Sequence, residues 1–167
     1  MPYSAVTHLA VSAVCGAAAG ALTVYLSGGW GGGTTTRPPR RRPRPIATPD
    51  ASPAGGHYSQ AVVANGQVAV SGLLPITPTG QQLAGESFEV QVKCVLRNLR
   101  AILVAAGTSE KKLVSCRVYV TDIARWGEFN RLYAEFLGKE TKPARCVVPV
   151  PVLHYGLLLE LEAVASL

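Results

Sequence analysis

Two stretches near the C-terminus decide the fold: PARCVV at residues 143–148 and LLLELEAV at residues 157–164. Both are short aliphatic runs bounded by proline or glycine, which is typical of β-strands. Alternation along the second run places Glu160 and Glu162 on one face and most of its leucines on the other. One face of this strand therefore belongs to a core, and the other carries charge. We expect the rest of the chain to bring Arg145 and Glu160 to the same cleft.

The composition indicates one folded domain with an extension. The 167 residues carry a formal net charge of +6, but residues 1–56 hold five arginines against one aspartate. Residues 57–167 are close to neutral, so the basic charge belongs mainly to the N-terminal part. The four cysteines are scattered and show no metal-binding spacing, so we expect free thiols, no metal site and a reducing compartment.

Residues 1–27 are interpreted as a hydrophobic anchor or targeting leader. Residues 9–26 contain no charged side chain and would span about 27 Å as a helix, close to the thickness of a membrane core. Arginines follow this run, and the positive-inside rule would leave the domain behind them facing the cytosol. An arginine-rich, acid-poor leader is also typical of organellar transit peptides. We expect membrane contact through residues 9–26 or a mitochondrial address; the alternative is a cytoplasmic protein with a disordered extension.

Residues 28–56 are expected to form a disordered linker, because glycine, proline and arginine dominate them. The folded domain is then expected to occupy residues 57–167. It begins with a β-hairpin, since the Asn65-Gly66 pair is typical of the tight turn between two strands, here residues 61–64 and 67–71.

Two amphipathic helices follow the hairpin. Ser87 is the expected N-cap of the first, whose apolar residues recur at helical spacing as far as Gly107. The second follows Asp122 and ends at Gly138, and residues 113–120 alternate between the two as a strand. The residues expected on one side of that strand are Val114, Cys116, Val118 and Val120, and the expected stripe of the second helix is Trp126, Phe129, Tyr133, Phe136 and Leu137.

This order of elements predicts an α+β two-layer sandwich, with a mixed sheet and two helices on one of its faces. The second face of the sheet then has no helices to cover it. Because its strands carry apolar as well as polar residues there, we expect this face to pack against other subunits in a homo-oligomer.

Seven segments within residues 57–166 match one known family in order and spacing. They are residues 58–61, 70–75, 95–99, 118–122, 129–133, 143–145 and 159–163. With them the chain resembles the RidA/YjgF reactive-intermediate deaminases. The resemblance implies a chorismate-mutase-like fold, assembled as a homotrimer with clefts at the subunit interfaces.

The resemblance also implies an activity: hydrolysis of 2-enamine and 2-imine carboxylates, such as those released by dehydratases, to 2-oxo acids and ammonia without a cofactor. The family's carboxylate-binding arginine falls on Arg145, and its water-positioning glutamate falls on Glu160. The other positions, expected to bind substrate, fall on Tyr58, Ser71, Gly72, Asn130 and Cys146. The usual Arg-Ser-Cys run is Arg145-Cys146-Val147 here, which bears on substrate preference.

Elementary chemistry supports these roles. A planar guanidinium binds a carboxylate bidentately, and a half-buried carboxyl group can take a proton from water and return it to a leaving nitrogen. Taken without the resemblance, Arg145 and Glu160 are more simply a structural ion pair. We expect Glu162 to be structural, and His57 and His154 to be solvated.

Two alternatives stand beside the imine deaminase. One is a non-catalytic trimer that binds a small ligand or has a regulatory role. The other is an endoribonuclease or translation inhibitor, which the near-neutral domain disfavours because it lacks a basic and aromatic surface stripe. We therefore expect a small 2-imino acid as the partner, rather than nucleic acid.

Overall fold

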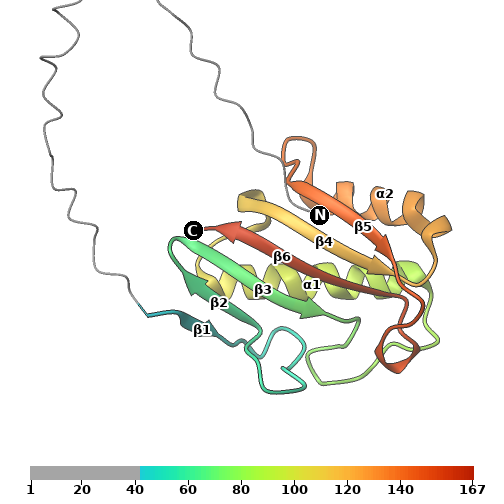
Figure 1. The fold of residues 1–167 in the computed structure, drawn as a ribbon, viewed down its shortest axis with the longest axis horizontal. Helices are drawn as coiled ribbons and strands as arrows, with labels where there is room; N and C mark the ends of the chain where they lie inside the picture. Colours follow the sequence, from blue (N-terminus) through green and yellow to red (C-terminus); the bar gives the residue numbers. More distant parts are fainter. Residues whose placement is uncertain (1–41) are drawn as a thin grey trace, which may run out of the picture. The chain divides into compact units, whose positions relative to one another are not determined.

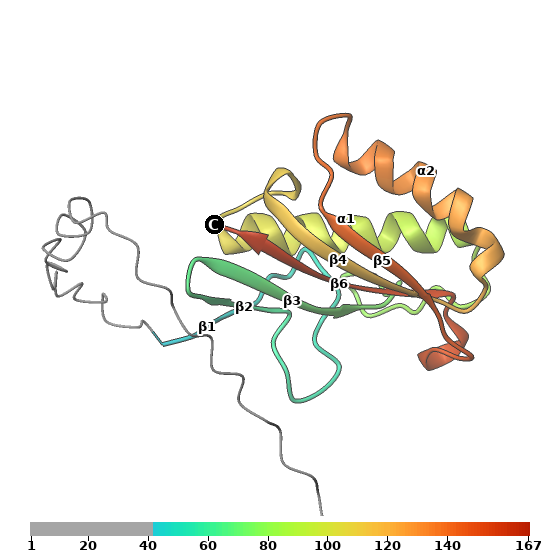
Figure 2. The ribbon, with the colours of Figure 1, turned by 45° about the horizontal axis from the view of Figure 1, so that its top comes forward.

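The structure, a computed structural model, describes residues 42–167 as one six-stranded mixed sheet with two α-helices (Figure 1). In chain order the elements are β1 (Arg44–Ile46), β2 (Ala61–Ala64), β3 (Gln67–Leu73), α1 (Phe88–Ala106), β4 (Leu113–Val120), α2 (Trp126–Leu137), β5 (Ala144–Pro149) and β6 (Leu159–Ser166). The strand order is β1-β2-β3-β6-β4-β5, and only β4 and β5 run parallel. Both helices lie on one side of the sheet (Figure 2), which confirms the predicted α+β two-layer sandwich.

The predicted hairpin is confirmed. β2 and β3 pair antiparallel, and Ala64 lies opposite Gln67 across a two-residue turn. Asn65 and Gly66 have φ angles of 51° and 75°. Positive φ at both central positions is the geometry that asparagine followed by glycine adopts most readily.

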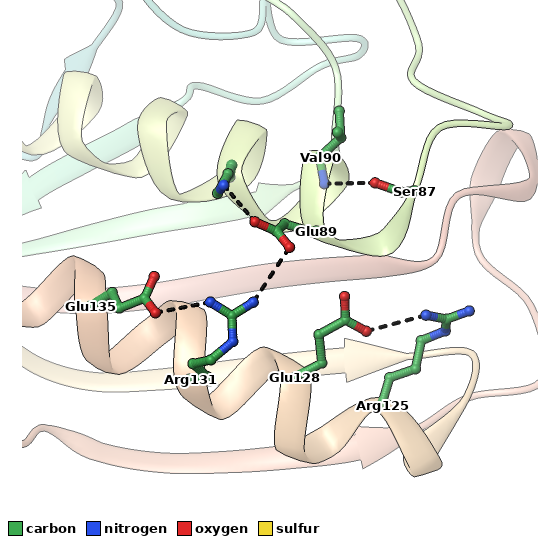
Figure 3. A network of polar contacts seen from close by, with 8 residues as sticks. Ser87, Glu89, Val90, Arg125, Glu128, Arg131 and Glu135 are labelled. Atoms are coloured by element: carbon green, nitrogen blue, oxygen red, sulfur yellow. Dashed lines mark hydrogen bonds and ion pairs between the residues drawn. The ribbon is translucent and has the colours of Figure 1, made fainter.

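Helix α1 is also confirmed. The Ser87 hydroxyl accepts a hydrogen bond from the Val90 amide at 3.3 Å (Figure 3). Gly107 caps the other end. Its buried face, which includes Val92, Leu99 and Ile102, packs into the core. The helix therefore covers the centre of the sheet.

Strand β6 alternates as predicted. Leu159, Leu161 and Ala163 are buried beneath the helices, whereas Glu160 and Glu162 are half-buried on the opposite face. Since β6 lies between β3 and β4, its charged residues lie at the middle of the uncovered face.

The predicted linker differs from the structure at its C-terminal end. Ile46 is 3% exposed and lies in β1, which pairs with β2. The Gln60 side chain donates to the Thr48 carbonyl at 3.1 Å and to the Ser52 carbonyl at 2.7 Å, so it ties the preceding loop to the sheet. The folded domain therefore begins before residue 57. The composition of this segment did not indicate that it is ordered, because hydrogen bonds to a buried amide side chain hold the loop, and not apolar residues alone.

Two side chains face differently from the prediction. Val114 is 46% exposed, because the pairing of β4 with β6 shifts by one residue between Leu113 and Ser115. This bulge turns Val114 away from the core. Trp126 is 47% exposed at the start of α2, while Leu132, absent from the predicted stripe, is buried.

The expected anchor or leader, together with the first part of the expected linker, lies outside the described residues. Within residues 42–167, no helix combines the length and apolar character needed to cross a membrane.

Candidate active site

Arg145 lies on the edge strand β5, with its side chain packed against α2. Its Nη2 donates a hydrogen bond to Oδ1 of Asn130 at 2.9 Å. The guanidinium carbon lies 4.9 Å from the ring centroid of Tyr133, 5.7 Å from that of Phe129 and 5.8 Å from that of Trp126. These four residues share one face of α2, because their spacing of three or four positions is close to a helical turn.

The Arg145 guanidinium forms no ion pair with a carboxylate of residues 42–167, and Glu135, which lines the same cavity, is paired with Arg131 instead. Between residues 42 and 167, no carboxylate lies within ion-pair distance of this half-buried guanidinium, although seven other ion pairs form there. A cavity of about 760 Å³ opens beside it, walled also by Tyr133, Lys139 and Lys142. A guanidinium in this setting can bind a carboxylate through two parallel N–H donors.

Glu160 lies on the opposite face of the sheet, where its carboxylate fills the space above Gly72 of β3. A Cβ at position 72 would lie 3.1 Å from Cδ of Glu160 and would overlap Oε1. Burial raises the pKa of the Glu160 carboxyl; His154 opposes this shift, and the negative charge of Glu162 adds to it. Burial favours the neutral acid, so the group can exchange protons nearer to neutral pH than an exposed glutamate does.

A second cavity, of about 370 Å³, contains Glu160 and three of the predicted substrate-binding residues, Tyr58, Ser71 and Gly72. The Ser71 hydroxyl donates to the Ser59 carbonyl at 2.7 Å, which fixes its orientation. Tyr58 is 53% exposed, and its hydroxyl accepts a hydrogen bond from the Gly55 amide at 3.1 Å.

His154 and Tyr155 also line this second cavity, although the sequence did not identify them as site residues. His154 is exposed, as expected, but its charge acts on the Glu160 carboxyl. Tyr155 has a φ of 62°, an uncommon value for a residue other than glycine. Histidine and tyrosine so close to Glu160 in the sequence are the signal that could have identified them.

Cys146 follows Arg145 and points to the uncovered face, where it is exposed. It lines a third cavity, of about 370 Å³, together with Arg117 and Glu162. Arg117 and Glu162 form an ion pair, and the Tyr119 hydroxyl lies 3.2 Å from the same carboxylate. Glu162 is thus engaged in a structural network, as expected.

The predicted site residues therefore form separate groups within one protomer. Arg145 and Asn130 lie together against α2, and Arg145 also lines the third cavity with Cys146. Glu160, Tyr58, Ser71 and Gly72 line the second cavity instead. A single protomer does not bring Arg145 and Glu160 into one cleft. Within residues 42–167, no three histidine, cysteine, aspartate or glutamate side chains gather in a way that could hold a metal ion.

Comparisons with known proteins all point to one family. The family model described as endoribonuclease L-PSP matches residues 48–167. A RutC family protein of Sinorhizobium fredii is 42% identical over 124 residues, covering 74% of this chain and 97% of the relative. The yeast protein MMF1, described as mitochondrial, is 36% identical over 72% of this chain and 82% of its own length.

Solved structures show the same similarity. RidA from an Antarctic Psychrobacter is 34% identical, with a TM-score of 0.70 over 74% of this chain and 99% of the other. The Escherichia coli protein TdcF, solved with bound serine, is 33% identical, with a TM-score of 0.70 over 74% of this chain and 98% of the other.

Proposed function

The chain belongs to the endoribonuclease L-PSP family, which includes the RidA, YjgF and RutC proteins, and on this basis we propose that it hydrolyses 2-enamine and 2-imine carboxylates to 2-oxo acids and ammonia. The observation that carries the proposal is the Arg145 guanidinium, which is half-buried, held by Asn130 and has no acidic partner within residues 42–167. A carboxylate ligand satisfies both its charge and its planar geometry.

In this proposal Arg145 binds the substrate carboxylate and so orients the neighbouring C=N carbon. Glu160 accepts a proton from the attacking water and returns one to the nitrogen as ammonia leaves. The burial that raises its pKa suits both steps, because one group then serves as base and acid. Imines of this kind already react with water, so positioning and one proton-transfer group are sufficient.

We further propose that the protein is a homotrimer, in which Arg145 of one protomer and Glu160 of a neighbour face the same cleft. The separation of the two residues within one protomer supports an interface site. The uncovered sheet face supports it too, because this face presents apolar side chains such as Val148, which is 37% exposed. Light scattering should give three times the mass of the chain.

A relative with a bound ligand supports the substrate class that we propose. TdcF, a relative of this chain, holds serine, an amino acid with a carboxylate next to its nitrogen-bearing carbon. We propose that the substrates here are 2-imino acids with the same arrangement, such as those formed when a dehydratase removes water from serine or threonine.

A coupled assay tests the proposal. A dehydratase generates the imine, and the release of 2-oxo acid is followed with and without the full chain. Arg145→Ala should lose about 100-fold or more in kcat/KM, and Arg145→Lys should recover only part of it, because lysine is not bidentate. Arg97→Ala, which removes an exposed arginine of α1, is the matched control and should be fully active. Full activity in Arg145→Ala would exclude the proposed role.

A second candidate is a ligand-binding protein without catalysis. The separation of Arg145 from Glu160 favours it if the chain is monomeric in solution, because carboxylate binding needs only the α2 side of the molecule. A monomer that binds 2-oxo acids and leaves the imine untouched would support this candidate over the enzyme.

The mitochondrial description of MMF1 supports a mitochondrial location for this chain, with residues 1–27 as a targeting leader. Sequencing the N-terminus of the native protein tests this assignment. A mature chain that begins after the leader supports import, whereas an intact Met1 in a membrane fraction supports an anchor.

A further inference from the structure

We propose that the face of α2 formed by Trp126, Phe129, Asn130 and Tyr133, here called the α2 cradle, positions the Arg145 guanidinium and thereby sets the affinity of the site for a carboxylate. The inference rests on the proposed function, in which this carboxylate belongs to a 2-imino or 2-oxo acid. It assigns the three aromatic residues as positioning residues that act through Arg145.

The cradle has the geometry of a multiple cation–π contact. The three ring centroids lie between 4.9 and 5.8 Å from the guanidinium carbon, inside the distance of about 6 Å at which such contacts are effective. Phe129 and Tyr133 are stacked on each other, with centroids 5.5 Å apart and an interplanar angle of 26°. Because Phe129 and Tyr133 are 0% and 5% exposed, the core holds these two rings in place before any ligand binds.

The cradle leaves donors of Arg145 free. A guanidinium has five N–H donors, all in its plane, and Asn130 accepts a hydrogen bond from only one nitrogen. Aromatic rings take no strong N–H bonds but exclude water, so the remaining donors interact more strongly with an anion. An arginine held by a carboxylate would instead have its donors occupied and its charge neutralised.

Helix α2 is itself fixed against α1 by a network of charged residues (Figure 3). Arg131 of α2 bonds Glu89 of α1 at 3.4 Å and Glu135 at 2.9 Å. The Arg125 guanidinium lies 5.3 Å from the ring centroid of Phe88, and its Nη1 bonds Glu128 at 3.2 Å. Exposed ion pairs contribute little stability individually. The Arg131–Glu135 and Arg125–Glu128 pairs lie within α2 and its N-cap, whereas the contacts of Arg131 with Glu89 and of Arg125 with Phe88 reach α1 and orient α2 against it.

Substitution of Trp126 tests the positioning of Arg145 separately from core packing. Trp126 is 47% exposed, so its ring contributes little to the core, yet it lies within cation–π distance of Arg145. Its removal leaves no buried cavity, unlike the removal of Phe129.

The test measures binding of 2-oxobutanoate to the full chain by calorimetry. Trp126→Leu should weaken binding about threefold to thirtyfold, and Trp126→Phe should restore most of it. Phe136→Leu is the matched control, because Phe136 lies on the same helix but contacts a different arginine. The guanidinium carbon of Arg100 lies 4.6 Å from the Phe136 ring centroid. In this control the affinity should not change.

Two further measurements separate positioning from a general structural effect. In the coupled assay, Trp126→Leu should raise KM in step with Kd and leave kcat nearly unchanged, since carboxylate binding is shared by ground and transition states. In nitrogen-15 NMR spectra, the Hε signal of Arg145 should be displaced by ring currents in the wild type and should move toward the free-arginine position in Trp126→Leu.

The outcomes are distinguishable. Unchanged affinity in Trp126→Leu, or equal losses in Phe136→Leu, overturns the cradle alone. Binding of 2-oxobutanoate without imine turnover overturns the proposed enzyme and leaves the cradle supported if Trp126→Leu weakens that binding. A wild-type chain that binds no 2-oxobutanoate overturns both.

Discussion

Replacing Gly72 with alanine tests how the sheet holds Glu160. The Glu160 carboxylate occupies the space where a side chain at position 72 would begin, since an added Cβ would lie 3.1 Å from Cδ and 3.5 Å from Cγ and would overlap Oε1. Gly72 is not among the glycines with positive φ, so alanine fits the backbone without strain. The substitution therefore acts on the carboxylate rather than on the fold.

The expected magnitude follows from that geometry. To restore ordinary contact distances, the carboxylate has to swing aside by about 1 Å or more, and a misplacement of this size costs about 100-fold in rate. Glu160→Gln, which removes the proton-transfer group, should cost about 100-fold to 10,000-fold. A double variant that combines Gly72→Ala with Glu160→Gln tests whether Gly72→Ala acts only by moving Glu160. If it does, the double variant should be no slower than Glu160→Gln alone.

The assay is dehydratase-coupled release of 2-oxo acid, with thermal unfolding measured on the same samples. Gly127→Ala is the control, because a Cβ at that position in α2 meets no atom within 4 Å, and it should be fully active. Gly72→Ala should unfold within a few degrees of the wild type. Wild-type activity in a folded Gly72→Ala, or rate losses that multiply in the double variant, would refute the reasoning.

The remaining predictions concern stability. Because the pKa of Glu160 is raised in the fold, the folded state binds its proton more tightly than the unfolded state, and the wild type loses stability as pH rises above the ordinary glutamate pKa. Glu160→Gln should therefore unfold at a higher temperature than the wild type at pH 7, and this difference should shrink below about pH 4.5; an equal difference at both pH values would contradict it. A chain of residues 57–167 should unfold at a lower temperature than one of residues 42–167, because it loses Ile46 and the partners of Gln60; equal melting temperatures would mean that β1 contributes nothing.

Much of the fold was predictable because its signals are local. The Asn65-Gly66 turn requires only that two adjacent residues adopt positive φ. The Ser87 cap requires only a hydroxyl three residues before the Val90 amide, from which it accepts a hydrogen bond. The alternation of β6 likewise depends on the period of a strand and not on its neighbours. The bulge at Val114 was not predictable, since it arises from the register between two strands.

By itself, the sequence determined the order of the main helices and strands, their inward faces and the residue types available for chemistry. Only the tertiary structure decided which of those residues meet. Packing of α2 on the sheet places Asn130 and three aromatic rings around Arg145, and pairing of β3 with β6 places Gly72 beneath Glu160. These contacts join segments far apart in the chain, and they depend on strand order and helix orientation, which no local pattern of side chains specifies.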